Sequence, residues 1–239
     1  MQNGGEIMAK VKTTKLDIIR CASEMFFQQG YSATSPKQIC ERLDISTGNL
    51  TYYFPTKEHL LAVFTEMLCD YQQKMMEIEA EEGVSSVLSV CLELTTMAAM
   101  CEDSEIAKEF YLASYTSPIC LEIIRRNDTQ RNKRVFAQYC PNWTDEQFVE
   151  AELIVSGIEY ATLMTAGDPV SLETRIAGAL NNILTIYNIP EELRKTKIEK
   201  VLKIDYRRIG QRVLRDFKTY IARENEAALE ELINAKSKR

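Results

Sequence analysis

A stretch of small and polar side chains around residue 50 has the chemistry to read DNA bases. Its hydroxyls and its amide can donate and accept hydrogen bonds at base edges, and its small residues let a helix approach those edges closely. Leu50 and Phe54 are four residues apart, so on a helix both turn inward. The outward face then comprises Thr47, Gly48, Asn49, Thr51, Tyr52 and Tyr53. Two tyrosines and a glycine on an exposed helix indicate a contact surface, with plain helix packing as the alternative.

The helix that carries this surface is predicted to run from Thr47 to Phe54, with Ser46 as its N-cap. Another short helix is predicted just before it. There Ser35 is the expected N-cap, Pro36 suits the first helical position, and Gln38 completes a capping box. The inner face of this earlier helix is expected to consist of Ile39, Cys40 and Leu43.

Asp44 lies in the turn between these two helices, where Asp tolerates unusual dihedral angles better than most residues. A first helix is predicted from Thr14 to Gln29, and Gly30 would end it as a left-handed cap. Its apolar stripe has helical spacing and consists of Ile18, Ile19, Ala22, Met25 and Phe26. Three helices in this order predict a helix-turn-helix at about residues 35–57 that would place its last helix in a DNA major groove.

Lys57 follows this unit at the expected N-terminus of the next helix. A cation there is unfavourable for the helix dipole. A phosphate is well placed beside the same helix end, because the first backbone N–H groups of a helix are free to bind it. The position therefore indicates a contact between Lys57 and the DNA backbone.

The N-terminal sequence resembles the DNA-binding domain of TetR-type transcriptional repressors. The resemblance covers about residues 12–64 and rests on the strings IIRCASEMFFQQGY at 18–31 and STGNLTYYFPTKEHLL at 46–61. It implies base contacts from Thr47, Gly48, Asn49 and Tyr52. It also implies contacts to the DNA backbone from Ser35, Pro36, Lys37, Tyr53 and Lys57. The sequence departs from the family pattern at Thr51, where a tyrosine is usual, and at Asp44, where a turn glycine is usual.

Charge is distributed unevenly along the chain, although the net charge is only −6. Residues 1–60 hold 7 basic and 6 acidic side chains, residues 61–189 hold 8 and 20, and residues 190–239 hold 14 and 9. An acidic body repels nucleic acid, so a DNA contact is expected to use the N-terminal segment.

Composition argues against several other classes of protein. A single histidine removes the parts for a zinc site or a histidine-based catalytic triad, so we expect no enzyme, metal or cofactor. The seven cysteines contain no Cys-x-x-Cys pair, which favours reduced structural thiols over a redox sensor or a disulfide framework. The sequence shows no membrane span and no signal peptide, so we expect a cytoplasmic protein with no membrane partner.

The region after residue 58 is predicted to be entirely helical, with helices at 59–82, 84–101, 104–116, 118–139 and 144–166 and a further helix after Pro169. The polar stripe Ser86, Ser89, Glu93 and Thr96 is expected to be a solvated edge, with a pocket lining as the alternative. The family resemblance implies a ligand pocket among the first of these helices. Candidates for its lining, with ordinary core packing as the alternative, are Met67, Tyr71, Cys91, Thr95, Met100, Phe110, Tyr111, Ser114 and Tyr115.

The helix at 144–166 and the one after it present broad apolar seams with small residues, which suit a four-helix bundle between two subunits. The family resemblance also implies dimerisation through such a hairpin, and an internal core hairpin is the alternative. The expected interface residues are Ile154, Gly157, Ala161, Met164, Ile176, Ala179, Leu180, Ile183 and Tyr187. Residues 190–239 form a basic extension, expected to be a long amphipathic helix packed on the body, with a second partner surface as the alternative.

Together these patterns predict an all-α protein with a helix-turn-helix DNA-binding domain at residues 1–57 and a larger helical ligand-binding and dimerisation domain at residues 58–239. The expected function is a homodimeric repressor that a small apolar or aromatic effector releases from a near-palindromic double-stranded operator. An alternative on the same scaffold is an architectural or cell-division factor that binds DNA and a protein partner.

Overall fold

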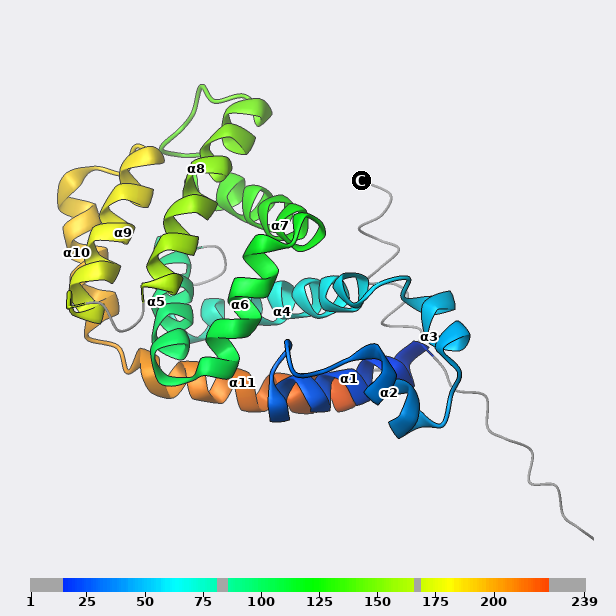
Figure 1. The fold of residues 1–239 in the computed structure, drawn as a ribbon. Coiled ribbons are helices and arrows are strands. Elements are labelled where there is room, and N and C mark those ends of the chain that lie inside the picture. The colour runs from blue at the N-terminus through cyan, green and yellow to red at the C-terminus, as the bar shows by residue number, and fades with distance from the viewer. Residues whose placement is uncertain (1–14, 81–85, 166–168, 224–239) are drawn as a thin grey trace, which may run out of the picture.

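The computed structural model describes residues 15–80, 86–165 and 169–223. Within these ranges the chain forms helices and no strand, as Figure 1 shows. The expected all-α class is therefore confirmed. The helices are α1 (Lys15–Gln29), α2 (Pro36–Leu43), α3 (Thr47–Tyr53), α4 (Lys57–Glu79), α5 (Val87–Asp103), α6 (Glu105–Thr116), α7 (Pro118–Phe136), α8 (Asp145–Met164), α9 (Leu172–Ile186), α10 (Glu191–Leu202) and α11 (Tyr206–Arg223).

The predicted caps and turns of the N-terminal unit are confirmed. Ser35 accepts a hydrogen bond from the backbone N–H of Gln38, and the Gln38 side chain accepts one from the backbone N–H of Ser35, so the capping box is complete. Gly30 ends α1 with φ of +91°, and Asp44 ends α2 with φ of 50°. The apolar stripe of α1 is buried. Because α1 contacts α2, α6 and α11, it holds the helix-turn-helix against the body.

In the body, α5 is the central helix. It contacts α4, α6, α8, α9, α10 and α11, and its side chains are buried on nearly every face. This packing corrects the expectation of a solvated edge. Ser89 and Thr96 are buried, and Glu93 pairs with Arg131 of α7, because neighbouring helices cover the side of α5 that carries the polar stripe.

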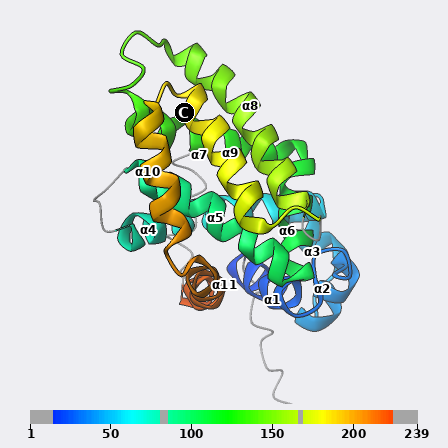
Figure 2. The same cartoon turned by 90° about the vertical axis from the view of Figure 1, so that its left-hand side faces the viewer.

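The C-terminal extension forms α10 and α11 rather than one continuous helix, with a break at residues 203–205. The amphipathic character of the second part is confirmed: Tyr206, Ile209, Val213 and Phe217 are buried. Figures 1 and 2 show α11 beneath the body and beside α1, and α11 contacts α1, α4 and α5. Gly210 permits the close approach to α5, because a Cβ there would lie 2.8 Å from Cγ of Met100.

Some expectations fall outside the described residues, namely the helix end at Gly83, the turn at Gly167 and Asp168, and the end of the extension at 224–239. Among the described helices, none is long and apolar enough to cross a membrane.

Candidate nucleic-acid interface and helical body

The third helix presents the side chains that the sequence predicted for base contact. Leu50 and Phe54 are buried, whereas Thr47, Gly48, Asn49 and Thr51 are exposed. Tyr52 is 81% exposed, and its ring packs edge-on against that of Tyr53 at a centroid distance of 5.0 Å. A large aromatic side chain so open to solvent on a short capped helix is suited to contact another macromolecule.

Two local hydrogen bonds define which polar groups on α3 can reach a partner. Ser46 caps the helix by accepting from the backbone N–H of Asn49 at 3.1 Å, and Asn49 itself is exposed. The Thr51 hydroxyl donates to the backbone carbonyl of Thr47 at 3.0 Å, so it is turned back along the helix. Asn49 and Tyr52 therefore offer exposed polar groups on this face.

The start of α2 offers a second exposed edge. Pro36 and Lys37 are exposed, and Ser35 is half-buried. Lys37 Nζ lies 3.7 Å from Glu41 on the next turn, and both side chains are largely open to solvent. Such a loose surface pair contributes little and leaves the lysine able to bind a phosphate instead.

Lys57 is held differently from Lys37. Its ammonium donates a hydrogen bond to the backbone carbonyl of Tyr31 and lies 4.0 Å from the centroid of the Tyr31 ring. Burial lowers the pKa of Lys57, while Glu109 and Glu58 oppose that shift. In this conformation Lys57 braces the loop after α1, and a phosphate contact requires its side chain to turn away from Tyr31.

The helix-turn-helix unit contacts the body through a hydrogen bond and several aromatic rings. The backbone N–H of Ser32 donates to Glu109 of α6, and the Phe27 ring packs edge-on against Phe217 of α11 at 6.1 Å. Lys218 also lies over the Phe27 ring, 4.8 Å from its centroid. The role of Glu109 could not be predicted from the sequence, because a glutamate on an amphipathic helix is usually a solvated surface charge.

Among the described helices α4 to α8, one interior cavity has a volume of about 30 Å³. Four predicted pocket residues border it: Phe110, Tyr111, Ser114 and Tyr115. Of the other candidates, Tyr71 packs at a tilt against the rings of Phe217 and Tyr220 of α11, and the rest lie in the core away from this cavity: Met67, Cys91, Thr95 and Met100. Ordinary core packing thus describes these five side chains in this conformation.

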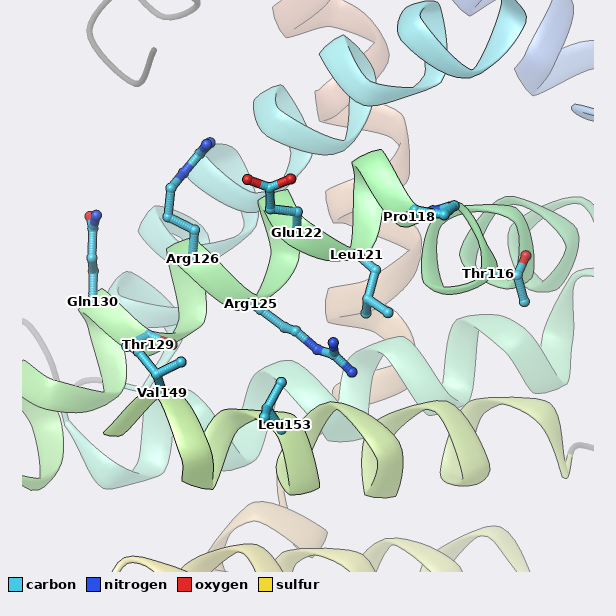
Figure 3. Close-up of a pocket in the computed structure, with 10 residues that line it drawn as sticks. All are labelled: Thr116, Pro118, Leu121, Glu122, Arg125, Arg126, Thr129, Gln130, Val149 and Leu153. Carbon is cyan, nitrogen blue, oxygen red and sulfur yellow. The ribbon is translucent and has the colours of Figure 1, made fainter. Parts of the chain in front are cut away.

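A larger hollow lies on the outer side of the body, where α6, α7 and α8 meet. This open groove has a volume of about 610 Å³, and none of the predicted pocket residues lines it. Figure 3 shows Leu121 and Arg125 of α7 directed toward Leu153 of α8, whereas Glu122 and Arg126 point to the opposite side of α7. Arg125 bridges the two helices, since its Nε donates to Ser156 Oγ at 2.9 Å.

Buried charges form a network behind this groove that the sequence analysis missed. Arg131 of α7 pairs with Glu93 of α5 and, at 2.9 Å, with Asp128. On α8, Glu152 accepts from Asn132 at 3.0 Å and Glu159 accepts from the Tyr115 hydroxyl at 2.9 Å. The seven-residue spacing of Glu152 and Glu159 puts both on one face of α8, but this signal does not identify the helix that faces them.

The two helices expected at the dimer interface differ in the exposure of their predicted interface residues. On α8, Ile154 is 55% exposed, Gly157 and Ala161 are exposed, and Met164 is half-buried. The expected α9 residues are all buried inside the protomer: Ile176, Ala179, Leu180, Ile183 and Tyr187. Tyr187 even stacks on Phe136 of α7 at 4.2 Å. This corrects the expectation for α9, whose apolar face fills the protomer's own core and is not open to a partner.

Comparisons with known proteins support the assignment of the N-terminal unit as a helix-turn-helix domain. Residues 18–63 match the family model "Bacterial regulatory proteins, tetR family". The HTH-type transcriptional regulator QacR of Staphylococcus aureus is 40% identical over 67 residues, which are 28% of this chain and 34% of QacR. The chain therefore matches about a third of that relative's length.

The solved structures that the chain matches are more distant in sequence. The tetR regulator tylp from Streptomyces fradiae has a TM-score of 0.48 and 15% identity, with 84% of this chain and 95% of that chain covered. The TetR family protein CprB from S. coelicolor A3(2) has a TM-score of 0.44 and 20% identity, covering 81% of this chain and 95% of that chain.

Proposed function

We propose that this chain, whose N-terminal helices are a TetR-type DNA-binding domain, is a transcriptional regulator that binds double-stranded DNA through α3. The observation that carries the proposal is the exposed face of a capped recognition-type helix. Asn49 and Tyr52 extend from it while Leu50 and Phe54 anchor it from below. Side chains of this kind contact base edges in a major groove.

The contacts to the DNA backbone are proposed at the edges of this helix. Ser35, Pro36 and Lys37 would bring the start of α2 to one phosphate, and Tyr53 would contact another. Lys57 would join them once its ammonium leaves the Tyr31 carbonyl. The domain boundary is proposed at the start of α4, after residue 57, because α4 runs from the helix-turn-helix into the body.

The regulator is proposed to act as a homodimer on a near-palindromic operator, since each protomer carries one reading helix. The surface that supports this is the outer face of α8, where apolar side chains stand open to solvent. Its members are Val149, Leu153, Ile154 and Tyr160, with the small residues Gly157 and Ala161 between them. In twofold dimers the same surface of both subunits forms the interface, and an exposed apolar face suits that role.

An effector is proposed to weaken DNA binding by favouring a second conformation of the body. The route to the DNA-binding unit would be α6, which holds the loop after α1 through Glu109 and Ser32. An apolar ligand of ordinary size needs at least about 300 Å³. It would therefore either expand the 30 Å³ cavity beside Tyr111 and Tyr115 or occupy the 610 Å³ groove between α7 and α8.

The decisive experiment is selection of bound sequences from random DNA with the full chain. We expect a near-palindromic motif whose half-sites are spaced by about one helical turn, or 34–36 Å. The Asn49→Ala variant, run in parallel, should relax the motif at one symmetric position. Recovery of no enriched motif, or of a motif unchanged by Asn49→Ala, would contradict DNA reading by α3.

A further inference from the structure

The buried charge network in the body is unbalanced. Four carboxyl groups, those of Glu93, Asp128, Glu152 and Glu159, surround the single guanidinium of Arg131. If all were ionised, the four acids and one base would leave a net charge of −3 in the interior. Uncompensated charge is very costly away from water, so the network must take up protons or a cation.

Three of these carboxylates converge on one point. The oxygens that Asp128, Glu152 and Glu159 offer all lie within 4.8 Å of one another. Ligands at the usual 2.0–2.6 Å from one ion stand roughly 3–5 Å apart, so a single ion could contact all three. Arg131 holds one oxygen of Asp128, and a carboxylate has a second oxygen for an ion.

An amide beside this cluster supplies an independent indication of a ligand. Asn132 is 2% exposed, and its Nδ2 donates to Glu152 at 3.0 Å, which sets the amide at the edge of the cluster. Its Oδ1 is buried without a hydrogen-bond partner among the described residues, and so is Oε1 of the fully buried Glu152. Two buried acceptor oxygens without donors are rare, because each loses its hydration on burial.

We propose that this cluster binds one hard divalent cation, of the class of Mn²⁺, Mg²⁺ or Ca²⁺. Asp128, Glu152 and Glu159 supply carboxylate oxygens and Asn132 supplies its carbonyl oxygen. A donor set made only of oxygen suits these ions, whereas soft metals favour thiolate or imidazole. The 30 Å³ cavity bordered by Asp128 and Glu159 has room for one water on the ion.

The cation site reaches the DNA-binding unit through one helix. Tyr115 of α6 donates to Glu159, and Glu109 of the same helix accepts from Ser32 in the loop after α1. A cation that draws Glu159 toward Asp128 and Glu152 therefore acts on the helix that holds that loop. This consequence for DNA rests on the proposed function, whereas binding of the cation does not.

Binding is tested on the full chain after treatment with EDTA and dialysis. Titration with Mn²⁺, followed by calorimetry and by electron paramagnetic resonance, should show one saturable site per chain and a rise in the melting temperature. No saturable site, or saturation that leaves the melting temperature unchanged, would overturn the proposal.

Matched variants distinguish Mn²⁺ binding at this site from Mn²⁺ binding by exposed carboxylates. Glu152→Gln keeps the shape of the side chain and should weaken Mn²⁺ binding by about 10-fold or more. Glu150→Gln, an exposed carboxylate on the same helix, should leave the affinity unchanged. Equal affinity in the Glu152→Gln and unmodified chains would place the bound metal on the surface and reject the site.

A second variant, which is expected to bind the metal more tightly, tests the site even if Glu152→Gln does not fold. Asn132→Asp replaces Nδ2, which faces Glu152, with a carboxylate oxygen, so the added negative charge should tighten Mn²⁺ binding and make folding more dependent on the metal. A variant that binds Mn²⁺ no more tightly would argue against coordination by residue 132. Operator binding measured in EDTA tests the proposed function separately, since α3 does not contain this site.

Discussion

The backbone N–H of Ser32, in the loop that follows the first helix, donates a hydrogen bond to the Glu109 carboxylate in the middle of α6. The same carboxylate fills the space beside Gly30, where a Cβ would lie 2.3 Å from Glu109 Oε2. Glu109 is thus a side chain of the body that directly holds the DNA-binding unit. Any movement of α6 acts on the loop that orients α1 and α2.

Removing this contact should loosen the loop without unfolding the body. In Glu109→Ala, the Ser32 amide loses its acceptor, and we expect its hydrogen exchange to become at least about 10-fold faster. Exchange of the central helix α5 should stay as it is. A Ser32 amide equally protected in both proteins would show that the contact does not constrain the loop.

Substitution of Asn49 can show whether this residue contacts a base or the DNA backbone. Asn49→Ala should cost about 1–3 kcal/mol for the preferred operator and much less for operators altered at the position that Asn49 reads. Fluorescence anisotropy with a panel of single-base operator variants gives both numbers. A uniform loss over the whole panel would instead assign Asn49 to the backbone.

The two lysines beside the recognition helix should respond differently to substitution. Lys37→Ala should lower the slope of log affinity against log salt by about 1 and leave stability unchanged, because its side chain is exposed. Lys57→Ala should lower the same slope if its ammonium reaches a phosphate. It should also lower the free energy of unfolding, because Lys57 binds the Tyr31 carbonyl and ring. A reduced melting temperature in Lys37→Ala would contradict this distinction.

The dimer face that we propose on α8 predicts opposite behaviour for two isoleucines. Ile154→Glu places a charge on a side chain that is 55% exposed in the protomer, so it should yield a folded monomer with much weaker operator binding. Ile183→Asp places a charge in the protomer's own core and should unfold it. Sedimentation and circular dichroism distinguish these results. A folded dimer in Ile154→Glu would place the interface elsewhere.

The buried acids predict an unusual dependence of stability on pH. Burial raises the pKa of Glu159 from 4.5 to about 8, and Asp128 adds to the shift. The folded state therefore holds a proton that the unfolded state has lost between these pH values, and stability should fall as the pH rises through that window. In metal-free buffer, Glu159→Gln should flatten this decline and stabilise the protein most at about pH 8. An unchanged pH profile would show that Glu159 is ionised in the fold.

Much of the N-terminal unit could be predicted from the sequence because its determinants are local. The capping box at Ser35 and the left-handed turn at Asp44 depend on neighbours within a few residues. The burial of Leu50 and Phe54 follows from helical spacing alone. These features need no knowledge of the rest of the chain.

The errors concern contacts between distant segments. The apolar face of α9 was expected to meet a second subunit, yet Ile183 packs inside its own protomer. Glu93 was expected at a solvated edge, yet it meets Arg131 of another helix. Hydrophobic periodicity shows which face of a helix is buried, but it does not identify the helix that buries it. For the same reason the buried acids on α8 could not be assigned to one cluster.

The packing of Phe27 against Phe217 also has a consequence for the order in which the protein matures. The two rings come from α1 and α11, near opposite ends of the chain. Synthesis proceeds from the N-terminus, so α1 leaves the ribosome long before its last packing partner exists. Until α11 emerges, Phe27 lacks that cover, and the DNA-binding unit of a prematurely terminated chain stays incompletely packed. A truncated product should therefore compete poorly for the operator and be a better substrate for proteases than the finished chain.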